Sequence, residues 1–145
     1  MHQQSNQREI RKIDFIFYNE RAIRRKIYET RRDPNPAQLL VKPSNPLIGD
    51  PVGNQVIRKL TKLREIKFEN GMVLKDPETW IEFIEEAYSR TDEKTKGIAQ
   101  EFYRNERIER TCSRFGISKS AYYARINRFR QFAMMQAISK SLIKF

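Results

Sequence analysis

The chain is poor in the residues from which most catalytic and metal sites are built. Its 145 residues include one histidine, His2, and one cysteine, Cys112. A single cysteine cannot form an internal disulfide, which favours a reducing compartment. One histidine cannot supply a catalytic set or a histidine-rich metal site, and the sequence holds neither an HExxH segment nor a glycine-rich phosphate loop. We therefore expect no enzyme activity, no catalytic residues, no metal and no cofactor.

Long apolar runs are also lacking. Apolar residues make up 39% of the chain and charged residues 32%, and the mean hydropathy is −0.77. No run approaches the roughly 18 apolar residues of a membrane span, and the N-terminus lacks the apolar core of a signal peptide. We expect no membrane contact and a cytoplasmic location. The apolar content fits an extended or oligomeric helical protein better than one compact globule.

Positive charge is what the chain has in excess, with 29 Lys and Arg against 18 Asp and Glu and a net charge of +11. Residues 1–49 carry a net +5, residues 50–105 a net −1 and residues 106–145 a net +7. Excess charge of this size favours a polyanionic partner, usually nucleic acid. The alternative is that basic surface only aids solubility.

The periodicity of residues 8–32 predicts one long N-terminal helix. Apolar residues recur every three or four positions, at Ile10, Ile13, Phe17, Ile23 and Ile27. Such a stripe must be buried against another helix or against a copy of itself, so residues 1–33 are predicted to serve in oligomerisation or partner contact. Aromatic residues such as Tyr28 interleave with basic ones here, and we expect packing rather than base stacking from them.

Five of the six prolines lie between residues 34 and 51, which predicts a proline-rich linker over residues 34–49. The remainder, residues 50–145, is predicted to form four to five helices. Asp50-Pro51 would begin a helix that runs to about Glu69, and Asp76-Pro77 would begin the next helix. Asp92 or Thr91 would cap a third helix that ends near Arg104. No convincing strand is found, and the expected fold class is all-α.

The last two helices are predicted to form a helix-turn-helix over residues 107–132. Gly116 can adopt the positive φ of a tight turn, and Ser118 can cap the helix that follows, which runs to about Ser141. The first helix would turn Ile108, Cys112 and Phe115 inward. The second would bury Tyr122, Ile126, Phe129 and Ala133, which share one face.

The opposite face of the last helix would then enter a major groove of double-stranded DNA. The residues predicted to read bases are Lys119, Ser120, Tyr123, Asn127 and Arg130. The residues predicted to contact phosphates are Arg107, Arg110, Arg114, Arg125 and Arg128. The alternative is an ordinary helical hairpin with a solvated basic face.

The order of these segments resembles a known family. Residues 50–60 (Asp-Pro-Val-Gly-Asn-Gln-Val-Ile-Arg-Lys-Leu), Trp80–Tyr88, Glu93–Tyr103 and the turn segment ending Ser-Ala-Tyr-Tyr at Tyr123 resemble phage and prophage transcription regulators of the RinA/ArpU type. The resemblance covers about residues 50–135. It implies control of late genes, and a C-terminal part similar to region 4 of bacterial sigma factors.

The leading hypothesis is therefore a sequence-specific, DNA-binding transcription regulator of phage or prophage origin that works as a dimer or higher homo-oligomer. Its N-terminal helix would support assembly or contact RNA polymerase. The alternative is a small terminase subunit, the adaptor that recognises phage DNA for packaging and works with a large terminase subunit. A third hypothesis is a nucleoid- or RNA-binding structural protein without sequence preference.

Overall fold

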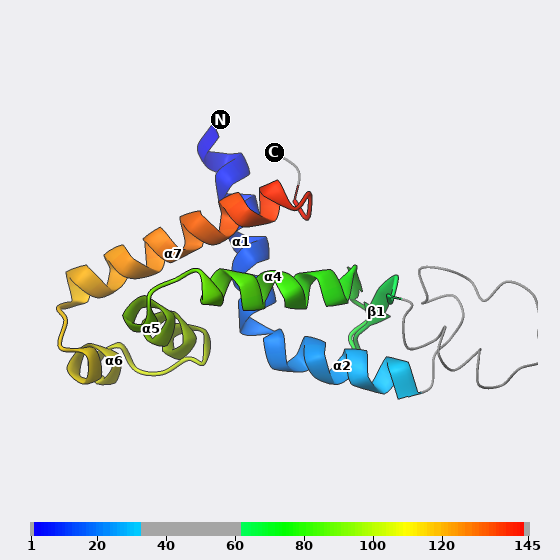
Figure 1. Ribbon diagram of the computed structural model, residues 1–145, viewed down its shortest axis with the longest axis horizontal. Coiled ribbons are helices and arrows are strands. Elements are labelled where there is room, and N and C mark those ends of the chain that lie inside the picture. Colours follow the sequence, from blue (N-terminus) through cyan, green and yellow to red (C-terminus); the bar gives the residue numbers. More distant parts are fainter. Residues whose placement is uncertain (1, 33–61, 144–145) are drawn as a thin grey trace, which may run out of the picture. The chain divides into compact units, whose positions relative to one another are not determined.

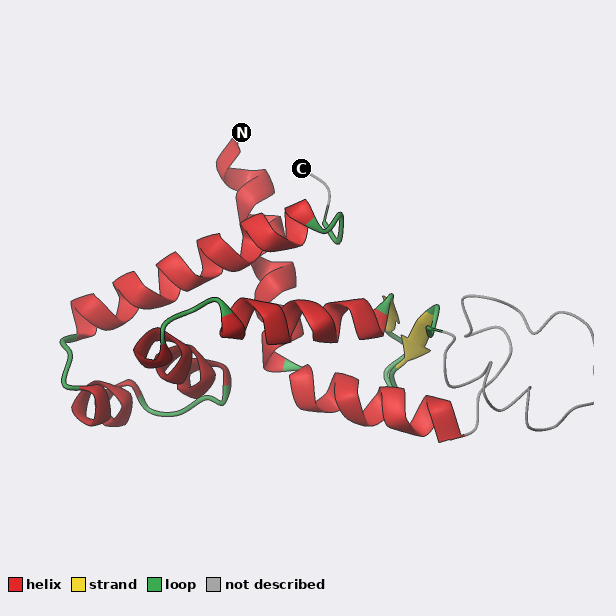
Figure 2. Ribbon diagram, viewed as in Figure 1, coloured by secondary structure: helices red, strands yellow, loops and turns green. Residues whose placement is uncertain are grey.

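The computed structural model describes residues 2–32 and 62–143, with side chains from Gln7 onward, and this part of the chain is mainly helical (Figures 1 and 2). It divides into two compact units: unit 1 comprises Met1–Asn19 and Glu82–Phe145, and unit 2 comprises Glu20–Ile81. The predicted proline-rich linker and the first part of the helix predicted from Asp50 lie outside the described residues. Within the described part, no helix combines the length and apolar character needed to cross a membrane.

The single N-terminal helix predicted for residues 8–32 is instead two helices. One residue, Asn19, separates helix α1 (His2–Tyr18) from helix α2 (Glu20–Arg32). At the break, both the backbone N–H and the side-chain amide of Asn19 donate to the carbonyl oxygen of Phe15, at 3.0 and 2.8 Å. Asparagine side chains compete in this way with regular helical hydrogen bonding, so a polar residue interrupts the predicted stripe.

Unit 1 is built from α1, the Glu82–Ser89 part of helix α4 (Pro77–Ser89) and helices α5 (Glu93–Tyr103), α6 (Ile108–Phe115) and α7 (Lys119–Ser139). Helix α7 contacts α1, α5 and α6, and α5 also contacts α1 and α6 (Figure 1). The predicted starts of α4 after Asp76 and of α5 after Asp92 are confirmed. The Asp92 carboxylate accepts a hydrogen bond from the Thr95 N–H at 3.0 Å, as an N-cap residue should.

The ring of Phe17 lies at the centre of unit 1. Its centroid is 5.0 to 5.8 Å from four other rings, those of Phe83, Tyr88, Tyr103 and Phe129. Three of these pairs meet edge to face and the pair with Tyr103 is stacked, both of which are favourable aromatic geometries. One side chain of α1 therefore joins helices α4, α5 and α7.

Unit 2 contains a β-hairpin that the sequence analysis did not predict. Strand β1 (Glu65–Lys67) pairs antiparallel with strand β2 (Val73–Lys75), with Ile66 opposite Leu74 (Figure 2). These two central side chains are buried and the strand residues beside them are half-buried or exposed, the alternation expected of a sheet with one covered face. The prediction of helix up to Glu69 is thus wrong for residues 62–69, and so is the expectation that the chain contains no strand.

Asn70 and Gly71 form the turn of this hairpin. Gly71 has a φ of 88°, in the region that glycine adopts without steric cost, and its N–H donates to the Phe68 carbonyl at 3.0 Å. The Asn70 side chain accepts from the Met72 N–H at 3.0 Å. An Asn-Gly pair can end a helix or turn a hairpin. The end of a helix was predicted here, and the structure has a hairpin turn.

Replacing Phe17 by Ala should destabilise unit 1 strongly, because it removes the ring that four others contact. We expect a loss of about 3–5 kcal/mol in the free energy of unfolding, measured by chemical denaturation. Met135→Ala, at an exposed position of α7 in the same unit, is the control and should change stability by no more than about 0.5 kcal/mol. Similar losses for both variants would contradict the central role of Phe17.

Candidate nucleic-acid interface

Helices α6 and α7 are joined by a tight turn at Gly116. This residue has φ 63° and ψ 44°, the left-handed conformation, and its N–H donates to the Cys112 carbonyl. The Ser118 hydroxyl then caps α7 by accepting a hydrogen bond from the Ala121 N–H at 3.1 Å. Both roles were predicted from the sequence and both are confirmed. The three residues between the two helices, Gly116, Ile117 and Ser118, thus complete the change of chain direction.

Helix α6 is attached to α5 by a buried carboxylate. Glu101 of α5 accepts a hydrogen bond from the Thr111 hydroxyl at 2.9 Å and pairs with Arg114 at 2.8 Å. Thr111 is fully buried, whereas Ile108, Cys112 and Phe115, the predicted inner face, are only half-buried. The contact between Thr111 and Glu101 could not be predicted from the sequence, because a polar pair on two helices leaves no apolar periodicity. Arg114, predicted to contact phosphate, keeps an exposed side chain but already has this partner.

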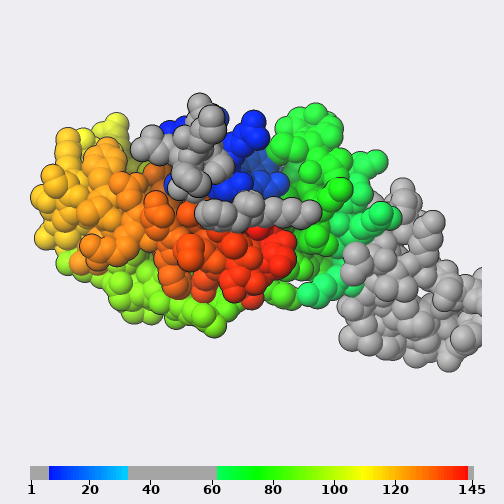
Figure 3. Space-filling model, turned by 90° about the horizontal axis from the view of Figure 1, so that it is seen from above, coloured from blue at the N-terminus to red at the C-terminus, as the bar shows by residue number. Residues whose placement is uncertain are grey.

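Helix α7 buries the face that the sequence predicted, with Tyr122, Ile126, Phe129 and Ala133 all at 2% exposure or less. On the outward side, the predicted base-reading residues Lys119, Ser120, Tyr123 and Asn127 are exposed. Nζ of Lys119 also lies 3.7 Å from Oε1 of the exposed Glu109. Atoms of α6 and of the first turns of α7 adjoin on the face of the molecule in Figure 3, where they are coloured yellow to orange.

Gln131 extends this exposed face by one helical turn beyond Asn127. It was not among the predicted site residues, although its spacing of four from Asn127 places both on one side of a helix. We define the outward face as Lys119, Ser120, Tyr123, Asn127 and Gln131. Amide side chains such as those of Asn127 and Gln131 can make paired hydrogen bonds to adenine.

Arg130, the fifth predicted base-reading residue, is occupied elsewhere. Its Nε donates to Asp14 of α1 at 3.0 Å, and its guanidinium lies 4.9 Å from the ring centroid of Phe102. The Tyr103 hydroxyl donates to the same Asp14 oxygen at 2.7 Å. Burial acts to lower the pKa of Arg130, but Asp14 and Tyr103 raise it overall. The side chain is 24% exposed, so we leave Arg130 out of the outward face.

The remaining predicted phosphate contacts fall into two groups. Arg107, Arg110 and Arg128 are exposed. Arg125 is half-buried: its guanidinium donates to the Thr95 hydroxyl at 2.8 Å and lies 3.6 Å from Asp92. Hydrogen bonds from Thr95 lower the pKa of Asp92. Arg125 and Arg128 also line a pocket of about 240 Å³ beside the start of α5.

The close approach of α6 to α5 at Gly97 can be tested by a double-mutant cycle. A Cβ at Gly97 would lie 2.7 Å from Cζ of Phe115, so Gly97→Ala should not give the usual helical gain of about 0.5–1 kcal/mol. In a Phe115→Leu background, which removes that atom, the gain should return. We expect a coupling of about 1 kcal/mol in the free energy of unfolding; strictly additive effects would contradict the packing described.

No group of three or more His, Cys, Asp or Glu side chains is placed to hold a metal ion within residues 7–32 and 62–143. The sequence matches no protein-family model, no curated protein and no solved structure. A function for this chain must therefore be argued from its own geometry and charge.

Proposed function

We propose that the protein binds double-stranded DNA in a sequence-specific manner, with helix α7 in the major groove. The observation that carries the proposal is the outward face of α7, whose side chains are exposed and polar while the opposite face is fully buried. A major groove admits a helix, and its base edges offer donors and acceptors that differ for each base pair. Asn127 and Gln131 are the residues proposed to read bases.

The charge around this face supports the proposal. Arg107 and Arg110 of the α6 region and Arg128 of α7 are exposed, and residues 106–145 carry nine Lys and Arg against two Glu. Phosphate contacts by such residues orient a protein on duplex DNA without reading its sequence. An ordinary helical hairpin would not require cations to gather beside the outward face.

The narrower proposal is transcription regulation of the RinA/ArpU type in a phage or prophage, by a homo-oligomer in which the N-terminal helix supports assembly or contacts RNA polymerase. The resemblance of residues 50–135 to that family supports it. The oligomeric state separates this role from its main competitor: a two-fold dimer in solution would favour a regulator. A ring of many subunits would favour the packaging adaptor, for which the large terminase subunit is the partner.

Asn127→Ala should relax sequence specificity. Once a preferred site has been obtained by selection from random duplexes, we expect the variant to lose about 1–3 kcal/mol of binding free energy for that site, measured by fluorescence anisotropy. Its affinity for unrelated DNA should not change, which serves as the internal control. Unaltered discrimination between the preferred and unrelated sites would argue against base reading by α7.

Arg107→Ala and Arg128→Ala should weaken binding to all sequences alike, because phosphate contacts release counterions whatever the base. Each variant should reduce the slope of log affinity against log salt by about 0.9, measured by titrations at several salt concentrations. Arg104→Ala, at an exposed position at the C-terminal end of α5, is the control and should leave the slope unchanged. A wild-type affinity independent of salt would remove the electrostatic basis of the proposal.

A further inference from the structure

Helix α2 in unit 2 carries a second concentration of positive charge. Six of its thirteen residues are Lys or Arg and two are Glu. Four exposed residues recur at steps of four, three and four positions: Arg21, Arg25, Tyr28 and Arg32. At 3.6 residues per turn they fall within an arc of about 60°. We call these four residues the α2 arc.

The rest of α2 is occupied by interactions within unit 2. Ile23 is fully buried and Thr30 is buried, Arg31 pairs with Glu78, and helix α2 contacts strand β1. Neither glutamate of α2 lies within the arc: Glu20 pairs with Arg24 at 3.0 Å on one side, and Glu29 lies on the other. The arc is thus a surface of three arginines and a tyrosine without an acid among them.

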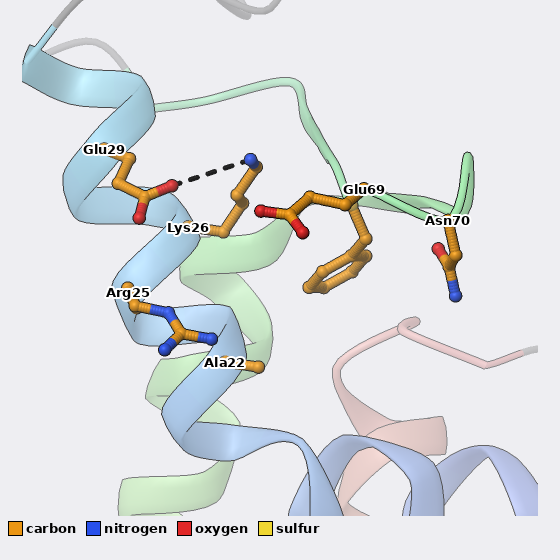
Figure 4. Close-up of a pocket in the computed structure, with 7 residues that line it drawn as sticks. Ala22, Arg25, Lys26, Glu29, Glu69 and Asn70 are labelled. Carbon is orange, nitrogen blue, oxygen red and sulfur yellow. Dashed lines mark ion pairs between the residues drawn. The ribbon is translucent and has the colours of Figure 1, made fainter.

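One border of the arc is a pocket of about 440 Å³ between α2 and the hairpin turn. Figure 4 shows Lys26 and Glu29 paired on this side of α2, at 3.5 Å, and Glu69 of the hairpin directed toward the helix. The two glutamates offset the charge of Lys26 inside the pocket, and Arg25 lies at the border that the pocket shares with the arc. The pocket itself is therefore a poor anion site, and the uncompensated charge lies on the arc beside it.

We infer that the α2 arc is a second DNA-contacting surface, which binds the phosphate backbone of duplex DNA without reading bases. This inference rests on the proposed function in taking DNA as the polyanion. Four helical residues rise about 6 Å, close to the axial rise of two nucleotides on one strand at 3.4 Å each. The arginines of the arc lie four and seven positions apart, and seven helical residues rise about 10.5 Å, close to three nucleotides. Guanidinium groups bind phosphate oxygens in pairs.

Tyr28 fits the same partner. Its side chain is 63% exposed, so the packing expected for it from the sequence is not found among the described residues. The Arg32 guanidinium lies 6.0 Å from its ring centroid. A phenol hydroxyl donates readily to phosphate or sugar oxygens. An anionic membrane is the less suitable partner for this basic helix, because membrane-surface helices insert a free apolar face, and Ile23 on the apolar face of α2 is already buried.

The test compares two variants of the full chain that lose the same charge in the same unit. The arc variant is Arg21→Gln/Arg25→Gln/Arg32→Gln. The control is Arg64→Gln/Lys67→Gln/Lys75→Gln, which changes three exposed cations on and beside the hairpin. We expect the arc variant to bind every duplex roughly 10- to 100-fold more weakly near physiological salt, with a salt slope reduced by about 2 to 3. The control should lose far less.

A conservative variant and a measurement on the unaltered protein keep the test decisive if the arc variant misfolds. Arg21→Lys/Arg25→Lys/Arg32→Lys keeps the charge and should keep most of the salt slope. In wild-type protein, bound DNA should protect Arg21, Arg25 and Arg32 from an arginine-specific reagent such as phenylglyoxal and leave Arg64 reactive, as read by mass spectrometry. Absence of this protection would overturn the inference even if the arc variant failed to fold.

The remaining outcomes separate this inference from the proposed function. Equal losses of DNA affinity for the arc variant and the control would mean that net charge alone determines binding, which would overturn the inference. Intact DNA binding by the arc variant, together with lost binding to phosphatidylserine vesicles, would assign the arc to a membrane instead. If wild-type protein binds no DNA, both proposals fail. If Asn127→Ala leaves specificity unchanged while the arc variant still loses affinity, only base reading by α7 fails.

Discussion

The arrangement of unit 1 depends on the aromatic contacts of Phe17. This ring reaches from α1 to partners on α4, α5 and α7, so the helix that precedes the others in sequence is packed between them. Phe129, which is one of those partners, lies on the buried face of α7. Its contact with Phe17 therefore fixes which side of α7 is turned inward. The outward position of Asn127 and Gln131 follows from that choice, since both lie on the opposite side of the same helix.

Two ion-pair clusters of unit 1 each include an arginine that was predicted to contact DNA. Glu101 forms an ion pair with Arg114, and Asp14 forms one with Arg130. Both carboxylates lie at helix contacts where removing a charge from water is costly unless a partner is present. The arginines that pair with them belong to the packing of the helices. Among the arginines predicted to contact phosphates, Arg107, Arg110 and Arg128 have no ion pair within the part of the chain that the structure describes, and these three are the ones proposed to meet phosphates.

Much of the helical part of the fold could be predicted because its signals are local. Asp92, Gly116 and Ser118 act on their own backbone neighbours, so a sequence reveals them directly. The hairpin was missed because strands of three residues show almost no alternation, and because Asn70-Gly71 also suits a helix end. The break at Asn19 was missed because the apolar spacing continues across it.

The candidate site was predictable in its outline and not in its details. A helical wheel orders the residues of α7 around their own axis, and this was enough to predict the buried face that the structure confirms. It contains no information on the charges of neighbouring helices, so the pairing of Arg130 with Asp14 could not be foreseen. Their separation of 116 positions in the chain has no local signature.

The exposure of the outward face has a consequence for how the protein can change over time. Substitutions at surface positions without structural partners usually alter stability by no more than about 0.5 kcal/mol, whereas those at Tyr122 or Ile126 would open a cavity. Gln131 can therefore vary almost independently of folding, whereas the ring of Tyr123 meets that of Tyr122 edge to face, with their centroids 5.2 Å apart. Under the proposed DNA binding, a few exchanges on one helix would change the preferred target of a lineage carrying this scaffold, while the helices beneath remain as they are.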